Sequence, residues 1–239
     1  MIGWRIKQDI DMILGQDPAA RSALEVICCY PGFHAVTLHR LAHSFYGAKL
    51  FFPARLISHI CRVLTGIEIH PGATLGHRVF IDHGMGVVIG ETAIVGDDVV
   101  IYQGVTLGAG AEARMGSITR GRKRHPTLGN GVIVGNGAAI QGDITVGNNV
   151  RVASGSILLK DVPDNCVVVG SPGRIIYRDG EKITGEMPDL VADAIKSLKD
   201  HINRLETSVA AISHSEPTQA KDDNGQADPL DIFLHGAGI

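Results

Sequence analysis

The amino-acid sequence predicts an α+β fold in which a block of helices precedes a parallel β-helix. One observation is a six-residue period of aliphatic residues, often followed by Gly, which fits neither an amphipathic helix nor an alternating strand. Each hexad would form one short side of a triangular coil, with its aliphatic residue pointing into the axis. A second observation is the helical spacing of apolar residues before the repeat. The repeat residues are Ile69, Leu75, Ile81, Ile89, Val95, Ile101, Leu107, Leu128, Val134, Ile140, Val146 and Val152.

Residues 1–65 are expected to form an α-helical region that covers the first coil of the β-helix. Helices at this end would protect strand edges that are otherwise unpaired. Asp17 stands directly before Pro18, which favours Asp17 as the N-cap and Pro18 as the first position of the second helix. The segments with helical spacing are 6–13, 19–29, 33–46 and 53–64.

The β-helix domain is expected over residues 66–178, and its period breaks first at Asp82 and His83. Ile81 and Ile89 are eight residues apart instead of six, so two residues are inserted at this point. An insertion bulges out of a packed wall, and loops held by a rigid scaffold commonly carry function. The insertion is therefore a candidate functional element.

The second break is an external loop of about residues 109–126. It arises because fifteen extra residues separate Leu107 from Leu128. The end of this loop, Arg120–His125, is the one basic run of the sequence. The run is either a solvated loop or an anion site, since guanidinium groups bind carboxylate and phosphate through paired hydrogen bonds. The length of the loop favours the anion site.

Two further segments follow the β-helix. Residues 188–213 are expected to form a C-terminal helix, with apolar residues spaced alternately by four and three. This spacing predicts either a coiled-coil seam or one amphipathic face packed on the chain's own β-helix. Residues 214–239 are expected to form a flexible tail that ends in an apolar patch at 230–234. The seam residues are Val191, Ile195, Leu198, Ile202, Leu205, Val209 and Ile212.

Composition excludes several classes of function. A chain of 239 residues with 44% hydrophobic and 20% charged residues is typical of a soluble globular protein. The net charge of −3 and the scattered Lys and Arg residues give no electrostatic case for binding nucleic acid. No apolar run reaches membrane-spanning length, and the N-terminus does not resemble a signal peptide. The four cysteines form no CxxC pair, which favours free thiols and a cytoplasmic location.

Eleven histidines raise the question of a metal site. The candidates are His70, His77, His83 and His125, because some β-helical enzymes bind zinc through histidines between subunits. Their spacing lacks the pattern of two near ligands and one far ligand. We therefore expect no metal.

Eight short segments carry a resemblance to a known family. They are Asp17–Ala19, Pro31–Ala35, Gly66–Ala73, Ile81–Gly84, Val88–Ala93, Gln103–Gly108, Lys123–Pro126 and Val169–Arg174. Together they resemble the short form of serine O-acetyltransferase, within the hexapeptide-repeat acyltransferase superfamily. The resemblance covers about residues 10–178 and implies a left-handed β-helix. The Asp-Pro-Ala, Gly-Phe-His-Ala, Asp-His-Gly and Arg-His-Pro segments, in this order, are far more specific than the hexads alone.

The resemblance implies transfer of acetyl from acetyl-CoA to the hydroxyl of L-serine, which gives O-acetylserine and CoA in cysteine biosynthesis. Acetyl-CoA is then a co-substrate, and no cofactor is bound permanently. His83 matches the catalytic general base of the family, since a serine hydroxyl needs a base when it attacks. Glu68 stands where many members have an Asp that orients this histidine. Transfer is expected to be direct, because neither Ser nor Cys adjoins His83.

The resemblance also implies the substrate contacts. Asp17 and Asp82 match residues that hold the serine ammonium group, and Arg124 and His125 match those that hold its carboxylate. The implied acetyl-CoA contacts are Gly108, Ala109, Asn136 and Ser154. One departure is Gly108-Ala109-Gly110-Ala111, where members commonly have Gly-Gly-Thr-Gly.

The family further implies a homotrimer with active sites between neighbouring β-helices, and inhibition by L-cysteine. Members end in an isoleucine that enters the active site of O-acetylserine sulfhydrylase, and Ile239 fits this pattern. The apolar patch before it could instead dock on the trimer. Two other functions stay open: another O-acetyltransferase of the superfamily, with a sugar or antibiotic acceptor, and a non-catalytic regulatory partner of the sulfhydrylase.

Overall fold

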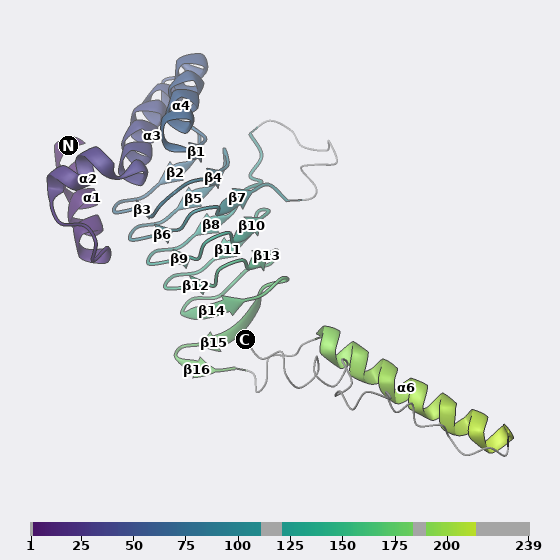
Figure 1. Ribbon diagram of the computed structural model, residues 1–239. Coiled ribbons are helices and arrows are strands. Elements are labelled where there is room, and N and C mark those ends of the chain that lie inside the picture. Colours follow the sequence, from purple (N-terminus) through teal and green to yellow (C-terminus); the bar gives the residue numbers. More distant parts are fainter. Residues whose placement is uncertain (1, 111–120, 184–189, 214–239) are drawn as a thin grey trace. The chain divides into compact units, whose positions relative to one another are not determined.

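The computed structural model describes residues 2–110, 121–183 and 190–213 (Figure 1). The chain divides into two compact units, residues 1–184 and residues 185–239. Within the described residues, the first unit contains four helices and a stack of short strands, and the second contains one helix. Most of loop 109–126 and the whole of tail 214–239 lie outside the described residues.

Four helices open the first unit, as the spacing predicts. They are α1 (Ile2–Gln16), α2 (Ala23–Cys29), α3 (Pro31–Gly47) and α4 (Phe51–Thr65). The expected N-cap of the second helix is wrong. Residues 17–20 form a turn, in which the Ala19 N–H donates to Asp17 Oδ1 at 2.8 Å. The Ser22 hydroxyl instead accepts from the Glu25 N–H at 3.2 Å, because Ser22-x-x-Glu25 is a capping-box sequence that competes with Asp17-Pro18.

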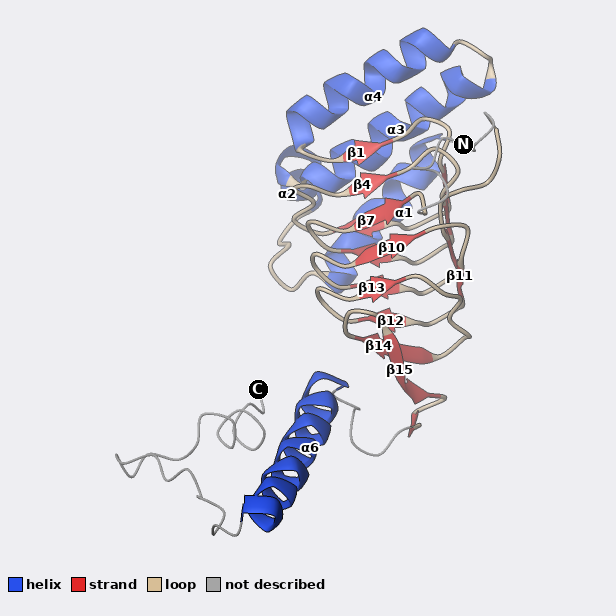
Figure 2. Cartoon of the chain, turned by 90° about the vertical axis from the view of Figure 1, so that its right-hand side faces the viewer, coloured by secondary structure: helices blue, strands red, loops and turns tan. Residues whose placement is uncertain are grey.

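The strands wind into three sheets, one for each side of the coil, and the pairs between β1 and β14 are parallel (Figure 2). The first sheet contains β1 (Glu68–Ile69), β4 (Val88–Ile89), β7 (Thr106–Gly108), β10 (Ala139–Gln141) and β13 (Ile157–Leu158). The second contains β2 (Thr74–Leu75), β5 (Ile94–Val95), β8 (Thr127–Leu128) and β11 (Thr145–Val146). The third contains β3 (Phe80–Ile81), β6 (Val100–Ile101), β9 (Ile133–Val134), β12 (Arg151–Val152), β14 (Cys166–Val169), β15 (Arg174–Arg178) and β16 (Glu181–Lys182). The fold class predicted from the sequence is confirmed: helices, a hexapeptide-repeat β-helix and a C-terminal helix.

The aliphatic residues of the hexads form one continuous core along the coil axis. All of them are buried except Leu75, which is partly buried against the same core. Ile69 pairs with Ile89 and Ile81 pairs with Ile101, so each coil repeats the path of the coil before it. The two-residue insertion is therefore confined to the corner between β3 and β4.

The two ends of the coil are closed in different ways. Helix α4 covers β1, and the Ser58 hydroxyl donates to the Ile69 carbonyl at 2.7 Å. Helix α3 lies on β3, and its Val36 joins the hexad core. At the other end, β14, β15 and β16 pair antiparallel and end the parallel stack.

The second unit contains helix α6 (Leu190–Ser213). The seam residues Leu198, Ile202, Leu205 and Val209 are all more than half exposed. The coiled-coil interpretation of residues 188–213 stays a prediction. No helix within the described residues is long and apolar enough to span a membrane.

Gly32 provides a test of how α3 lies on the coil. A Cβ at this buried position would overlap the carbonyl oxygen of Ile81, whereas a Cβ on Gly47, in the same helix, would meet nothing within 4 Å. We expect Gly32→Ala to lower the free energy of unfolding by about 2 kcal/mol, because the helix must move off β3. We expect Gly47→Ala to change it by less than about 0.5 kcal/mol. Denaturant unfolding of the two variants measures this, and equal stability would contradict the close approach of α3 to β3.

Candidate active site

The corner between β3 and β4 presents His83 to solvent. The side chain of His83 is 74% exposed, and its Nε2 lies 3.9 Å from Asp82 Oδ1. His83 has a positive φ of 57°, and Gly84 and Gly86 follow with φ of 71° and 78°. The Gly86 N–H donates to the Gly66 carbonyl at 2.9 Å, which fixes the inserted turn to the coil beside it. The insertion thus holds an imidazole outside the wall on a backbone that is itself hydrogen-bonded.

Asp17 supplies a second carboxylate to this corner. Its Oδ2 accepts a hydrogen bond from the Tyr30 hydroxyl at 2.6 Å. This bond, together with the Ala19 N–H and the charge of His83, lowers the pKa of Asp17. The same bond raises the pKa of Tyr30 to about 12, with a smaller contribution from Asp82. These interactions place Asp17 and Tyr30 in the electrostatic neighbourhood of Asp82 and His83, with Asp17 ionised.

Glu68 begins β1, beside the inserted turn. Its Oε2 accepts from Arg62 Nη1 at 3.0 Å, and its side chain is 30% exposed. Within the described part of the chain, Asp82 is the one carboxylate within 4 Å of the His83 ring nitrogens. The structure therefore places Glu68 in an ion pair with Arg62 of α4. The hydrogen bond that His83 would donate to Glu68 stays a prediction.

Arg124 lies at a different corner, between the first and second sheets. Its Nη2 forms an ion pair with Glu91 Oε2, and the Tyr46 hydroxyl donates to Glu91 Oε1 at 2.8 Å. Burial raises the pKa of Glu91, but the hydrogen bonds from Arg124 and Tyr46 outweigh this effect and hold the pKa below its ordinary value. Glu91 thus stays ionised and fixes the guanidinium group.

His125 is buried next to Arg124, and Thr92 fixes its tautomer. The Thr92 hydroxyl accepts from the backbone N–H groups of Arg124 and His125 at 3.0 and 3.1 Å, and lies 2.9 Å from His125 Nδ1. The Thr92 N–H also donates to Nδ1 at 3.2 Å. Nδ1 is therefore an acceptor and Nε2 carries the proton. Burial, followed by the charges of Arg124 and Lys123, lowers the pKa of His125 to about 4.

The residues expected to contact acetyl-CoA are also divided between these two corners. Asn136 follows β9 and Ser154 follows β12, so both lie in the same column of turns as His83. The Ser154 hydroxyl donates to Asn136 Oδ1 at 2.5 Å. Gly108 ends β7 and Ala109 follows it, on the corner that carries His125.

The two groups of site residues do not meet within one chain. They stand at opposite ends of the side that contains β1, β4 and β7. A side of about six residues, at ~3.3 Å for each residue, separates them by close to 20 Å. No group of His, Cys, Asp and Glu within the described residues has the geometry of a metal site.

Four contributors to these corners were not singled out from the sequence: Tyr30, Tyr46, Glu91 and Thr92. Tyr30, Glu91 and Thr92 each contact a predicted residue, namely Asp17, Arg124 and His125. Tyr46 acts one step further away, through its hydrogen bond to Glu91. Glu91 and Thr92 occupy the turn after a hexad Gly, within a segment that resembles the family. Their position could have marked them as candidate site residues. No sequence feature near Tyr30 or Tyr46 indicates that they bond to Asp17 and Glu91.

The hexad coil, its histidine insertion and the two charged corners define a hexapeptide-repeat acyltransferase. A family model described as "Bacterial transferase hexapeptide (six repeats)" matches residues 125–160. The chain is 50% identical to a serine acetyltransferase of Synechococcus elongatus, over 97% of each chain. The chain belongs to the serine acetyltransferase family.

Solved structures agree with this assignment. A Brucella abortus serine acetyltransferase in complex with coenzyme A has a TM-score of 0.69 and 39% identity, over 74% of this chain and 68% of that one. A Neisseria gonorrhoeae serine acetyltransferase in complex with serine has a TM-score of 0.67 and 35% identity, over 72% and 68%.

The electrostatics of the Arg124 corner give a prediction. We expect NMR titration to show that the His125 ring stays neutral down to about pH 4. Arg124→Gln removes a positive charge that disfavours the imidazolium, so we expect it to raise the pKa of His125 by about one pH unit. The matched control is Arg122→Gln, which removes an exposed charge two residues earlier and should leave the titration unchanged. A His125 that titrates near its ordinary value in the unmodified chain would contradict this account.

Proposed function

We propose that the protein transfers the acetyl group of acetyl-CoA to the hydroxyl of L-serine, giving O-acetylserine and CoA in cysteine biosynthesis. The observation that carries this proposal is the complementarity of the two corners. One offers an exposed imidazole beside two carboxylates, and the other offers a guanidinium group and a neutral imidazole N–H. A zwitterionic amino acid with a nucleophilic hydroxyl matches both.

His83 is the proposed general base. Its Nε2 takes the proton of the serine hydroxyl as the oxygen attacks the thioester carbonyl. The tetrahedral intermediate then expels the CoA thiolate, which recovers the proton from the imidazolium. The oxyanion accepts from a backbone N–H of the Gly108-Ala109 turn. The exposure of His83, 74% in a single chain, leaves the ring free to receive the substrate from outside the wall.

Glu68 is the proposed orienting carboxylate for His83. It stands on β1, which pairs with β4 directly after the inserted turn. Arg62 occupies Oε2, so Oε1 is the atom that would accept the second ring N–H of His83. A carboxylate in this role selects the tautomer and stabilises the imidazolium that forms.

Asp17 and Asp82 are proposed to bind the ammonium group, and Arg124 and His125 the carboxylate. The low pKa of Asp17 keeps it charged, and its bond to Tyr30 holds it in place. His125 donates from Nε2 because Thr92 occupies Nδ1. A neutral donor beside one guanidinium group binds the carboxylate without adding a second buried charge.

A homotrimer is proposed, because it would bring the two separated corners together. A three-fold axis repeats one contact three times, and each contact would bring the His83 corner of one protomer against the Arg124 corner of the next. Asn136 and Ser154 would then face Gly108 and Ala109 across the same boundary, which forms the groove for acetyl-CoA. In this arrangement serine and acetyl-CoA bind between protomers, where the His83 corner of one chain meets the Arg124 corner of the next.

The acceptor is tested by following CoA release with a panel that contains L-serine, sugars and hydroxylated antibiotics. Release with L-serine alone supports the proposal. Release with a sugar and none with serine would establish the alternative O-acetyltransferase, and no release at all would favour the non-catalytic role. L-Cysteine differs from serine by sulfur in place of oxygen, so we propose that it competes with serine for the same charged contacts.

The role of His83 is tested by substitution. We expect His83→Ala to lower kcat about 10²–10⁴-fold, because the base is lost. The matched control is His59→Ala, which removes an exposed imidazole from α4 and should leave kcat unchanged. Light scattering checks that both variants keep the oligomeric state of the parent. Near-normal turnover in a folded His83→Ala enzyme would exclude this residue as the base.

Ile239, which lies outside the described residues, is proposed to bind O-acetylserine sulfhydrylase through its side chain and free carboxylate. We expect deletion of Ile239 to abolish binding to the sulfhydrylase in a titration. The acetylation rate of the same preparation is the internal control, and it should not change. Unaltered binding after the deletion would show that Ile239 does not bind the sulfhydrylase.

A further inference from the structure

Helix α3 reaches both corners of the candidate active site through a tyrosine at each of its ends. Tyr30 is the N-cap residue of α3, and Tyr46 lies in its last turn. The Tyr30 hydroxyl donates to Asp17 Oδ2 at 2.6 Å, and the Tyr46 hydroxyl donates to Glu91 Oε1 at 2.8 Å. Each tyrosine therefore holds one carboxylate, and the two carboxylates stand at different corners.

The length and direction of α3 match the side of the coil that separates the corners. Its 17 residues, at 1.5 Å of rise for each residue, span about 25 Å, and the side of the coil spans close to 20 Å. Gly32 in the first turn lies against the Ile81 carbonyl of β3. At the other end, the Tyr46 ring stands edge-on to His70, directly after β1, with the ring centroids 5.7 Å apart. The helix thus runs from the His83 corner to the Arg124 corner.

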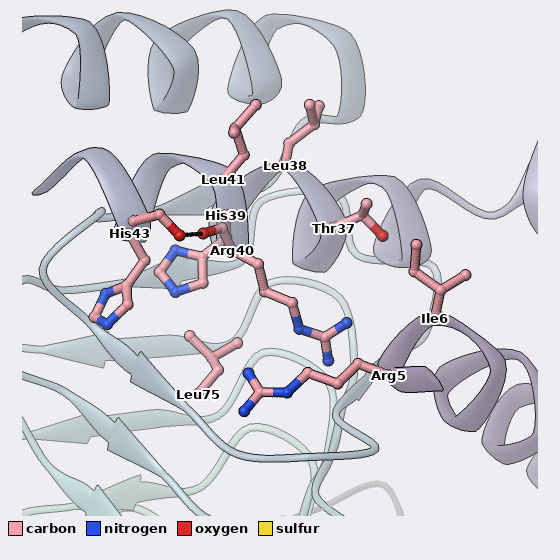
Figure 3. A pocket seen from close by; sticks show the side chains of 10 residues that line it. Arg5, Ile6, Thr37, Leu38, His39, Arg40, Leu41, His43 and Leu75 are labelled. Atoms are coloured by element: carbon pink, nitrogen blue, oxygen red, sulfur yellow. Dashed lines mark hydrogen bonds between the residues drawn. The ribbon is translucent and has the colours of Figure 1, made fainter. Parts of the chain in front are cut away.

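Between its two ends, α3 is fixed to the rest of the first unit. Arg40 forms an ion pair with Asp9 of α1, with Nη2 at 3.0 Å from Oδ1. His43 Nδ1 donates to the Pro71 carbonyl at 2.8 Å. Figure 3 shows the middle of the helix, where Arg40 and His43 both point to the side that carries Leu75. The positions of the two tyrosines are therefore set by the packing of the whole helix.

The bond from Tyr30 acts directly on a carboxylate of the His83 corner. It makes the largest contribution to the low pKa of Asp17. Asp17 Oδ1 accepts from the Ala19 N–H at 2.8 Å, so the Tyr30 hydroxyl holds the other oxygen. A hydrogen bond of this kind favours the ionised carboxylate and also fixes its direction.

The bond from Tyr46 acts on the guanidinium group of Arg124 one step further away. Burial alone would raise the pKa of Glu91, and the hydrogen bonds from Arg124 and Tyr46 together lower it. Tyr46 donates to Oε1 of Glu91, and Arg124 occupies Oε2. The hydroxyl thus fixes the rotation of the carboxylate, and with it the direction in which the guanidinium group points.

We propose that Tyr30 and Tyr46 are positioning residues for the substrate, one for each of its charges. Tyr30 sets the binding of the ammonium group through Asp17. Tyr46 sets the binding of the carboxylate through Glu91 and Arg124. Neither tyrosine takes part in the proposed proton transfer. The inference rests on the proposed function, in which these corners bind the two charges of L-serine.

The first test is an NMR titration of the carboxyl groups in the full-length protein, which needs no substrate. Tyr30→Phe should raise the pKa of Asp17 and leave that of Glu91 unchanged. Tyr46→Phe should raise the pKa of Glu91 and leave that of Asp17 unchanged. The matched control is Tyr177→Phe, which removes an exposed hydroxyl from β15 and should change neither. Each variant keeps its aromatic ring, and a thermal melt verifies that it is folded.

The second test uses two analogues that each lack one charge of L-serine. Ethanolamine lacks the carboxylate, and 3-hydroxypropanoate lacks the ammonium group. Their inhibition constants are measured in competition with L-serine, so neither has to be acetylated. Tyr30→Phe should weaken ethanolamine about threefold to tenfold and leave 3-hydroxypropanoate unchanged, since one positioning hydrogen bond is lost. Tyr46→Phe should do the reverse. Both variants should raise the KM for L-serine and leave kcat unchanged.

Two results would overturn the inference. One is an unaltered titration of Asp17 in Tyr30→Phe or of Glu91 in Tyr46→Phe. The other is a variant that weakens both analogues equally, because a general loss of structure has this effect. If the unmodified protein releases no CoA with L-serine, the proposed function fails, and the titration still decides whether the two tyrosines position their carboxylates.

Discussion

Each coil of the β-helix pairs in register with the coil before it, and this pairing determines where every polar group of the two corners can stand. Ile69 pairs with Ile89 and Ile81 with Ile101, so the buried hexad residues leave no room inside the wall for extra chain. Asp82 and His83 are extra residues, and they must leave the wall at a corner. A packed interior of this density does not absorb an insertion by small adjustments. The catalytic candidate is thus exposed because the core around it is closed.

The same constraint separates opposite charges that would otherwise neutralise one another. Asp17 and Asp82 stand at one corner, and Arg124 stands at the other, a full side of the coil away. Each corner stabilises its own charge locally: Tyr30 donates to Asp17, and Glu91 holds Arg124. In the proposed trimer, a second protomer would bring the two corners together, and a zwitterion would then bridge them. Pre-organised groups of this kind need little rearrangement when the substrate binds.

The sequence predicted the parts of the molecule that depend on local periodicity, and missed those that depend on stacking. The hexad residues could be located because the core accepts an aliphatic residue only at every sixth position. The insertion at Asp82 was visible as a break in this six-residue period. The contacts of Arg124 and His125 with Glu91 and Thr92 could not be predicted, since the partners are 32 or 33 residues away and become neighbours only when two coils stack. The one signal for Glu91 and Thr92 was their place in a segment that resembles the family. The ion pair of Glu68 with Arg62 was missed for a similar reason, because it depends on how α4 lies on β1. The misplaced N-cap at Asp17 was avoidable, as Ser22 and Glu25 form a recognisable capping pair.

The central claim is that one active site takes residues from two protomers, and mixed trimers test it most directly. Chains with His83→Ala and chains with Arg124→Ala are each expected to be almost inactive. When the two are co-expressed, random assembly around a three-fold axis should restore about one quarter of the sites, with a corresponding recovery of CoA release. The control mixture is His83→Ala with Asp82→Asn, in which both changes fall on the same corner and no intact site can form. Recovery in the first mixture alone is the predicted result, and its absence would show that one chain supplies the whole site.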